Sequence, residues 1–325
     1  MMKRKLIAAI LISTGLLLAS CQKDVDQFIP DPGQAIGPDT AWYSNITTDM
    51  PVTLLRNALL SDFTKDTIEV NSMADSIPLR GYGYCKFFPF SCVTPAGVPV
   101  TGPVTVEWNL VKSKGDMIRM NRASSSHNRL LVNGAGLSIA LKKDGQPLQL
   151  APGIHLSIDF YEANNTTVMS FFAGSSLTQN FTWLTNPDPL NNMVSPTNMG
   201  YHMFTNRLGW NDYGYFYDTT GITRTKISAS LPANYTNANS IMYAAFDNQL
   251  SVMELNADVV TEKFISPLLP DGKAVNIITI SKQGEDYYIS KIPLIIDGHG
   301  TGIQEISILP VKRTLAEIIT FLSSF

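Results

Sequence analysis

Short stretches in which apolar and polar residues alternate recur along most of the chain. In PVTVEWNLV, the side chains of Val104, Val106 and Trp108 fall on one side of an extended backbone, which is the pattern of a half-buried strand. DTIEVNS, TRTKISASLP and NSIMYAAFD have the same character and are rich in β-branched residues. The chain therefore predicts strands over most of its length, with no helix of normal length between 45 and 174.

Two longer segments predict hairpins through their turn residues. GLSIALKKDGQPLQLAPGIHLSIDF contains strands over 137–142 and 155–160, and the Asp-Gly and Pro-Gly pairs at 144–145 and 152–153 predict turns between them. AVNIITISKQGEDYYISKIPLII predicts a second hairpin with its turn near 283–285. Strands at this spacing are typical of a β-sandwich, so an all-β fold is expected.

One internal segment and the end of the chain depart from the strand pattern. Residues 176–200 are rich in Asn, Thr, Ser and Pro, and they predict a linker or a loop excursion between two β domains. In RTLAEIITFLSSF, the apolar residues at 315, 318, 319 and 322 follow the helical period. We expect this helix to pack on the protein, because its polar face lacks the Lys and Arg of a membrane-surface helix.

The first twenty residues are organised as an export signal. Three positive residues at 3–5 precede an apolar run over 6–19, which is shorter than the ~20 residues that span a bilayer. LASC, at 18–21, resembles the lipobox of bacterial lipoproteins, in which Cys21 becomes the first mature residue and carries the lipid. The alternative is an ordinary signal peptide over 1–20 with an incidental cysteine after it.

The residues after Cys21 refine the expected location. QKDVD, at 22–26, is similar to the lysine-plus-acidic signal that Bacteroidota place after the lipidated cysteine to send lipoproteins to the outer face of the outer membrane. It is also compatible with the start of a solvated tether over 21–44, since DPGQAIGPDT continues with Pro, Gly and Asp. We expect a lipid-anchored, surface-exposed protein of the cell outer membrane.

The charge of the mature chain argues against one class of partner. Removal of residues 1–20 takes away three positive charges and no acidic residue, so that 21 Lys and Arg remain against 27 Asp and Glu. A net negative charge without a basic cluster in the sequence argues against a nucleic-acid partner. The remaining length and the 44% hydrophobic content are sufficient for two domains with real cores.

Two further cysteines, Cys85 and Cys92, stand in GYCKFFPFSCVTPAG. In an exported protein this pair could close a small disulfide loop, which would stabilise the fold by about 2–3 kcal/mol. Two buried free thiols are the equal alternative, because a strand of period two can carry them on different faces. A metal site would need more ligands at matching spacing, and none of the four histidines is near in sequence.

Several motifs together carry a family resemblance. PAGVPVTGPVTVEWNLV, LLVNGAGLSIALKKDGQPLQLAPGIHLSI and NRLGWNDYGYFYD resemble the repeating framework of a family of Bacteroidota outer-membrane lipoproteins, and the first module is distantly similar to ZU5-type β-sandwiches. The resemblance covers most of 80–295. It implies two tandem Ig-like or ZU5-like β-sandwich domains over 45–175 and 201–295, followed by a tail over 296–325 that holds the short helix. Its motifs specify turns and packing more than function.

The resemblance also leaves a question about a polar site. In the family an Asn and an Asp commonly follow the tryptophan of the Leu-Gly-Trp segment with one-residue spacing. Here Asn211 and Asp212 are adjacent, and Gly214 stands where the Asp would fall. The chain therefore departs from the family's pattern at this polar site.

No string in the sequence has the spacing of a known catalytic or metal-binding motif. SSSHN, at 124–128, lacks the glycines of a nucleophile elbow, and its Ser-His order is the reverse of that in self-cleaving ZU5-type modules. His155, His202 and His299 have no second ligand at metal-binding spacing, and DGHGTG lacks the Lys-Ser/Thr ending of a phosphate loop. We therefore expect no catalytic residue, no metal and no cofactor.

One aromatic segment is the candidate ligand site of the sequence. Aromatic rings flanked by Asn and Asp commonly hold sugars or peptides, because the ring offers contact area and polar groups give direction. Packing in a core is the stronger interpretation for such a strand, since Trp and Tyr are commonly buried. The candidate residues are Trp210, Asn211, Asp212, Tyr213, Tyr215 and Tyr217.

The sequence thus predicts a lipid-anchored cell-surface protein that binds a glycan or protein ligand or organises the surface, without catalysis of its own. The alternative is an accessory or degraded hydrolase module that acts on surface glycans or peptides. A Ser/His pair or three carboxylates converging in one cleft would favour the enzyme, whereas an aromatic patch would favour binding.

Overall fold

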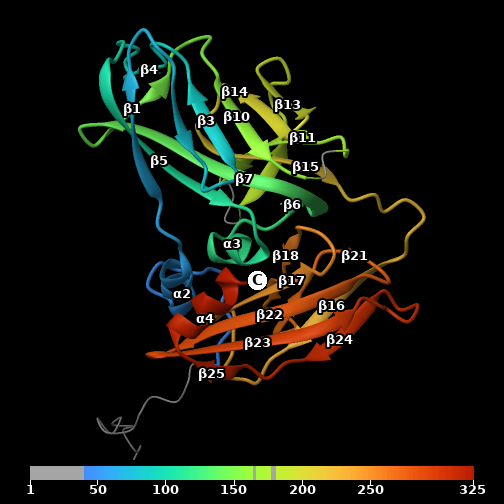
Figure 1. Ribbon diagram of the computed structural model, residues 1–325. Coiled ribbons are helices and arrows are strands. Elements are labelled where there is room, and N and C mark those ends of the chain that lie inside the picture. Colours follow the sequence, from blue (N-terminus) through green and yellow to red (C-terminus); the bar gives the residue numbers. More distant parts are fainter. Residues whose placement is uncertain (1–39, 164–165, 177–180) are drawn as a thin grey trace, which may run out of the picture. The chain divides into compact units, whose positions relative to one another are not determined.

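The computed structural model describes residues 40–163, 166–176 and 181–325. About half of these residues lie in strands of mainly antiparallel sheets, and residues 40–325 form one compact unit (Figure 1). The all-β fold with a short C-terminal helix is thereby confirmed. Cys21 and the segment 22–26 lie outside the described residues, so the lipid anchor and the export signal stay predictions.

The first sandwich packs an eight-stranded sheet against a five-stranded one. The larger sheet has the order β1-β5-β7-β15-β11-β12, with β6 and β8 paired to β7. Its strands are β1 (Thr64–Val70), β5 (Gly102–Val111), β6 (Ser125–Ser126), β7 (Arg129–Lys143), β8 (Gln146–Pro147), β11 (Ser170–Ser175), β12 (Thr182–Thr185) and β15 (Gly209–Phe216). β4 (Cys92–Val93) and β9 (Gln149–Leu150) form a separate two-stranded sheet.

The five-stranded sheet of the first sandwich has the order β13-β14-β10-β3-β2. Its strands are β2 (Asp75–Pro78), β3 (Gly83–Phe87), β10 (Leu156–Tyr161), β13 (Asn192–Thr197) and β14 (Gly200–Thr205). Alternate residues of the two sheets form one core, in which Val104 and Leu137 of the larger sheet join Phe87, Ile158 and Met203 of the smaller one. The alternation of Val104, Val106 and Trp108 is thus explained, because all three side chains are buried.

The second sandwich follows in the chain and packs two five-stranded sheets against each other. One contains β16 (Arg224–Ser230), β19 (Asn256–Asp258), β20 (Lys263–Ile265), β21 (Leu269–Pro270) and β24 (Ile303–Ser307), the last parallel to β16. The other contains β17 (Ser240–Phe246), β18 (Val252–Glu254), β22 (Ala274–Gln283), β23 (Asp286–Ile295) and β25 (Val311–Arg313). Ile227 and Phe264 meet Met242, Ala244 and Ile277 in its core.

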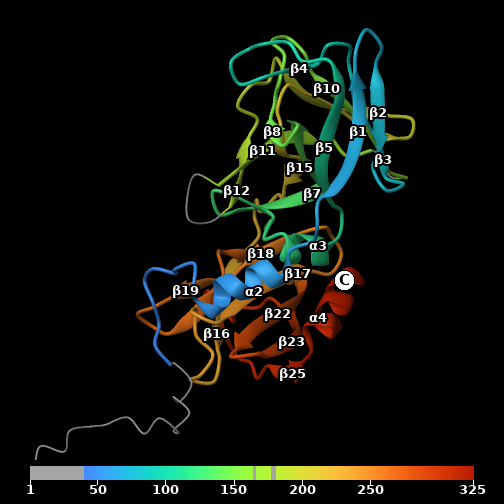
Figure 2. The same ribbon diagram turned by 90° about the vertical axis from the view of Figure 1, so that its left-hand side faces the viewer.

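Three short helices cover the second sheet of this sandwich. They are α2 (Pro51–Leu59), α3 (Lys114–Arg119) and α4 (Leu315–Ser323), and Figure 2 shows α2 along β17 and β22. Ile318 and Leu322 of α4 are buried in the cluster that also contains Ile241, Ile278 and Ile280. The helical spacing expected in the tail is therefore confirmed, and its apolar face packs on the protein.

Two of these helices were not expected from the sequence. In α2, Pro51 occupies a first-turn position where its missing N–H costs nothing, and Val52, Leu55 and Leu59 form the buried face. In α3, Ser113 and Asp116 form a capping box that fixes the start of a single six-residue helix. Both are too short for their periodicity to stand out against the surrounding strands.

The expected domain boundary is wrong. Segment 176–200, predicted as a linker or loop, contains β12 and β13, and the strands β14 and β15 that follow pair with β10 and β7 of the first sandwich. Sheet membership changes after Phe216 instead of at 201. The polar composition of 176–200 misled the prediction because β13 is an edge strand, where an exposed face and a proline such as Pro196 are tolerated.

Candidate functional site

The aromatic segment proposed as a ligand site is largely interior. It forms β15, which lies between β7 and β11 in the eight-stranded sheet. Asn211, Asp212 and Tyr213 each have 0% of their surface exposed. No ligand can reach these three side chains, so the hypothesis of a surface platform on β15 is wrong for them.

Trp210 is half-buried, but its ring is already engaged. The guanidinium carbon of Arg122 lies 4.6 Å from the Trp210 ring centroid and 4.2 Å from that of Phe181. Trp183 approaches Trp210 edge-on, with 6.5 Å between the ring centroids. Trp210 therefore has a structural role: it packs both on the cluster of the first sandwich that contains Trp183 and on the cluster of the helix-covered sheet.

The carboxyl group of Asp212 is buried with few partners. It accepts a hydrogen bond from the Asn133 amide, while its Oδ1 atom has no hydrogen-bond partner among the described residues. Burial away from water raises the pKa of Asp212 to about 7, and the hydrogen bond from Asn133 opposes this shift. The group can therefore exchange a proton near neutral pH, although it has no access to a substrate.

Tyr213 belongs to a polar cluster inside the first sandwich. Its hydroxyl donates to Glu162 Oε2 at 2.8 Å, and Lys112 Nζ lies 3.1 Å from both Glu162 Oε2 and the tyrosine hydroxyl. Burial and the neighbouring Glu162 raise the pKa of Tyr213 above its ordinary value. The cluster satisfies every charge that it contains, which indicates a structural role.

Cys85 and Cys92 are both free and buried. Cys85 lies on β3 in the core, whereas Cys92 lies on β4 beside Ser91. The disulfide alternative is therefore not observed. Burial raises the pKa of both thiols, which makes them poor nucleophiles at neutral pH.

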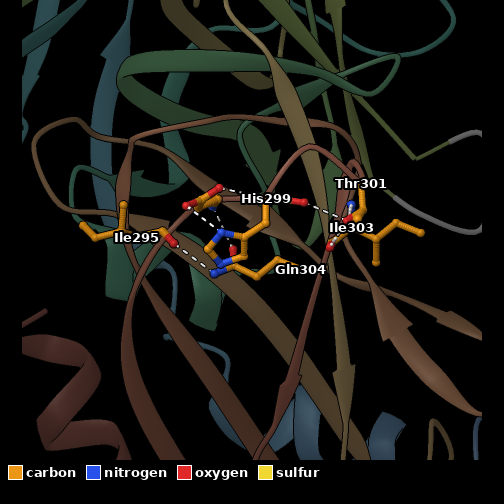
Figure 3. A network of polar contacts seen from close by, with 7 residues as sticks. Ile295, His299, Thr301, Ile303 and Gln304 are labelled. Carbon is orange, nitrogen blue, oxygen red and sulfur yellow. Dashed lines mark hydrogen bonds and ion pairs between the residues drawn. The ribbon is translucent and has the colours of Figure 1, made fainter.

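The DGHGTG segment forms a local network of hydrogen bonds after β23. Figure 3 shows His299 and Gln304 within it: the His299 backbone N–H donates to Asp297 Oδ1 at 2.8 Å, and Gln304 Nε2 donates to the Ile295 carbonyl at 3.0 Å. The Thr301 hydroxyl bonds the Ile303 carbonyl at 2.9 Å. These bonds close the turn that leads into β24.

His202 lies in a polar row on the outer face of the five-stranded sheet of the first sandwich. Its Nδ1 atom is 3.0 Å from Asp159 Oδ1, and Ser195 is its direct neighbour on the other side, across β13 and β14. A hydrogen bond to Asp159 raises the pKa of Tyr84, the next residue in the row. Ser195 and His202 also line a cavity of about 660 Å³.

This row has only part of what serine catalysis needs. In the described part of the chain, no hydrogen bond joins Ser195 to His202. The backbone N–H groups of the two inner strands β10 and β14 take part in ladder pairing on both sides, so they do not form an oxyanion hole. The row therefore orients a histidine without activating a nucleophile in this arrangement.

A second and larger cavity collects positive side chains from separate parts of the chain. It measures about 770 Å³ and lies where the end of β15 and the start of β7 meet β16 and β20. We call it the cationic cavity. Its charged and aromatic lining consists of His127, Arg129, Phe216, Tyr217, Arg224 and Lys226, with Asp218 as its one acidic residue.

The turn between β6 and β7 forms one wall of the cationic cavity. His127 and Asn128 have backbone φ angles of 50° and 64°, which is the left-handed conformation required at both central positions of a two-residue hairpin turn. His and Asn tolerate this conformation better than most residues. The turn exposes Asn128 and Arg129, and the Arg129 guanidinium stacks 3.6 Å from the Phe216 ring centroid.

β16 forms the opposite wall. Arg224 and Lys226 are two residues apart on this strand, so their side chains leave the same face, and both are exposed. In the described part of the chain, Arg129, Arg224 and Lys226 have no carboxylate within ion-pair distance. Three positive side chains without a negative partner therefore face one cavity.

Tyr217 is the residue of the sequence-predicted set that contributes to this cavity. Its ring is half-buried against the second sandwich, with Lys273 Nζ 5.3 Å from the ring centroid. Tyr215, by contrast, lines none of the cavities described above. The predicted site residues therefore do not form one site. Asn211, Asp212 and Tyr213 are buried, Trp210 is structural, Tyr215 lines neither cavity, and Tyr217 lines the cationic cavity.

Within residues 40–163, 166–176 and 181–325, no group of three or more His, Cys, Asp and Glu side chains is arranged to hold a metal ion. In the same part of the chain, no helix has the length and apolar character needed to cross a membrane. No model of a known protein family matches the chain, and a search of curated proteins finds no significant match.

Proposed function

We propose that the protein is anchored by lipid at the outer face of the outer membrane and binds an anionic ligand in the cationic cavity. The observation that carries the proposal is that Arg129, Arg224 and Lys226 lie around one cavity without carboxylate partners. The proposal joins this site to the export signal and lipobox at 1–21.

The gathering of three unpaired cations around one cavity supports a ligand. In the described part of the chain, six other Lys and Arg side chains make ion pairs with Asp or Glu and eleven do not, so the location of Arg129, Arg224 and Lys226 in one cavity is what distinguishes them. Like charges gathered in one cavity repel one another and gain nothing for the fold. A bound anion would relieve this repulsion and form charge-assisted hydrogen bonds with the arginines.

A comparison of purified variants in a binding assay tests the proposal. We expect acidic polymers to raise the thermal midpoint of the mature chain, and neutral polymers to leave it unchanged, because only the folded state offers the cavity. The double variant Arg224→Gln with Lys226→Gln should lose this response. The variant Lys65→Gln with Lys312→Gln is the control, since it removes the same charge from side chains that are 68% and 63% exposed outside the cavity.

Two results would count against the anionic ligand. One is an equal response of the cavity variant and the control variant, which would reduce the effect to net charge. The other is an equal response of the wild type to neutral and acidic polymers.

The row of Ser195, His202 and Asp159 supports a second candidate function, the hydrolysis of an ester or amide. Its support is the orienting contact between His202 and Asp159 and the cavity beside Ser195. A fluorophosphonate probe, which marks activated serines, distinguishes the two functions. We expect no covalent labelling, because Ser195 is not hydrogen-bonded to the histidine; labelling that disappears in Ser195→Ala would favour the hydrolase.

A further inference from the structure

We infer that the ligand of the cationic cavity is an acidic oligosaccharide, in which sugar carboxylates bind the arginines and neighbouring sugar units extend into an adjoining cavity. This inference rests on the proposed function and names its ligand class. It follows from the continuity of two cavities, from the mixture of side chains that lines them, and from the spacing of the positive charges.

The cationic cavity continues into a smaller one. The second cavity measures about 310 Å³, and His127, Asn128, Asn256 and Pro267 line both. Cavities that hold drug-sized ligands commonly measure about 300–1,000 Å³, so each of the two offers room for a separate part of a ligand. A ligand that fills both cavities must be extended and must pass the residues that the two cavities share.

The two cavities differ in charge. Lys and Arg side chains line the larger cavity and not the smaller one, whereas Ser125 and Thr182 give the smaller one neutral hydrogen-bonding groups. Glu254, the one acid of the smaller cavity, is already bound by Arg56 at 2.6 Å. A ligand that matches this arrangement carries negative charge on one unit and uncharged polar groups on the next.

The lining of the larger cavity suits a sugar better than a bare anion. Asn128, Thr220 and Asn256 lie among the cations and can form hydrogen bonds with hydroxyl groups, while the Asp218 carboxylate can accept a hydrogen bond from a hydroxyl group. Asp218 would repel a densely charged ligand. The half-buried ring of Tyr217 offers apolar area to the C–H face of a sugar ring.

In the described part of the chain, the lining of the two cavities also lacks the backbone donors that phosphate sites commonly use. Arg224 and Lys226 are two residues apart on a strand, which separates their Cα atoms by about 6.5 Å. Phosphate sites commonly converge backbone N–H groups from a glycine-rich loop or a helix start. Among the described residues that line the two cavities, none is a glycine and none belongs to a helix. Spaced carboxylates along a chain of sugars fit this distribution.

Calorimetric titration of the full mature chain in non-ionic detergent tests the inference. The probes are monomers and trimers of galacturonate, guluronate and glucuronate, the methyl esters of the same trimers, tetraglutamate, and inorganic phosphate. We expect at least one uronate trimer to bind at least tenfold more tightly than its monomer, its ester, tetraglutamate and phosphate. Arg224→Gln should weaken the trimer about tenfold, and Thr182→Val, which alters only the smaller cavity, should weaken the trimer more than the monomer.

The outcomes separate this inference from the proposed function. Preferred binding of tetraglutamate or phosphate, with loss in Arg224→Gln, would overturn the acidic oligosaccharide and keep an anionic ligand. Equal binding of monomer and trimer would overturn the extended ligand across the two cavities. If no anion binds, or if Arg224→Gln binds every probe as the wild type does, both the inference and the proposed function are wrong.

Discussion

Asp212 shows how one buried side chain couples the fold to pH. Its pKa is raised from an ordinary value near 3.8 to about 7, because burial disfavours the charged carboxylate. Below pH 4 the group is protonated in both the folded and the unfolded chain. Between about pH 4 and 7 the folded chain holds a proton that the unfolded chain has released, so the free energy of unfolding falls as the pH rises through this window.

We predict that Asp212→Asn removes this contribution. At about 1.4 kcal/mol per pKa unit, the carboxyl group costs the wild type a few kcal/mol of stability at pH 8 relative to pH 4. Melting temperatures of the wild type and Asp212→Asn, measured from pH 4 to pH 8, should diverge as the pH rises, with the variant the more stable at pH 8. Glu285→Gln is the control, because it replaces a carboxyl group by an amide at an exposed position outside the core. Parallel curves for Asp212→Asn and the wild type would refute the prediction.

Trp210 and Tyr215 lie on the same strand and should respond differently to truncation. Trp210→Ala removes the ring between Arg122 and Trp183, and we expect it to lower the free energy of unfolding by roughly 3 kcal/mol. Tyr215→Ala should cost about 1 kcal/mol or less, because Tyr215 is only half-buried. Chemical denaturation of both variants measures the difference. Similar losses in the two would mean that the strand is core throughout.

At the scale of elements, the bulge in β7 fixes how β15 packs. The register shifts between Tyr213 and Gly214, where Ala135 and Asn133 are the partners, so Gly134 is the additional residue on β7. A Cβ atom built at Gly134 would lie 1.9 Å from the Tyr213 ring. Only glycine leaves space for this ring against the backbone.

We therefore predict that Gly134→Ala destabilises the first sandwich and that Gly136→Ala does so much less. At Gly136 the nearest atom to a new Cβ is a Trp183 ring carbon at 3.4 Å, which a small shift can accommodate. Because the Tyr213 ring must move, we expect Gly134→Ala to lower the free energy of unfolding by about 1–3 kcal/mol, the range found for overpacked cores. Thermal melts of the two variants, which share the same added methyl group, provide the comparison. An equal loss in both would show that the bulge does not require glycine.

Elements with local signals could be predicted from the sequence. The turn at 144–145 adopts left-handed angles at both residues, as Asp-Gly predicts, and the C-terminal helix follows its apolar spacing. The role of 176–216 could not be predicted in this way, because strand pairing with β7 and β10 is a long-range property. Polar edge strands such as β13 have the composition of loops.

At the scale of the whole molecule, the cationic cavity is a product of tertiary assembly. Arg129 is contributed by the first sandwich, whereas Arg224 and Lys226 are contributed by the second, almost one hundred residues later. The alternation of Arg224 and Lys226 on one strand face was the one local signal available. No basic run marks the site in a chain whose charge is negative, so its charge pattern could not be predicted from composition.

The proposed location of the whole molecule depends on one residue outside the described part of the chain, Cys21. We predict that Cys21→Ala prevents lipid attachment and releases the protein into the aqueous phase or leaves it unprocessed. Detergent phase partitioning of cell extracts compares the variant with the wild type, and several acyl chains should hold the wild type in the detergent phase. Equal partitioning of the two would contradict the lipoprotein assignment.

The segment 22–26 gives a second prediction about location. Replacing Lys23, Asp24 and Asp26 with alanine should leave lipidation intact and abolish exposure at the cell surface. Digestion of whole cells with a protease measures this exposure. If the variant stays as accessible as the wild type, the segment is only the start of the tether.

Binding of labelled acidic polysaccharides to whole cells tests the central claim most directly, because it requires both surface location and a working cationic cavity. Cells that display the wild type should bind the label, and so should cells with the control variant Lys65→Glu with Lys312→Glu. Cells with Arg224→Glu and Lys226→Glu, matched for surface level by antibody, should not bind it, since the reversed charges repel the ligand. Equal labelling of cells with the cavity variant and the control variant would contradict the account.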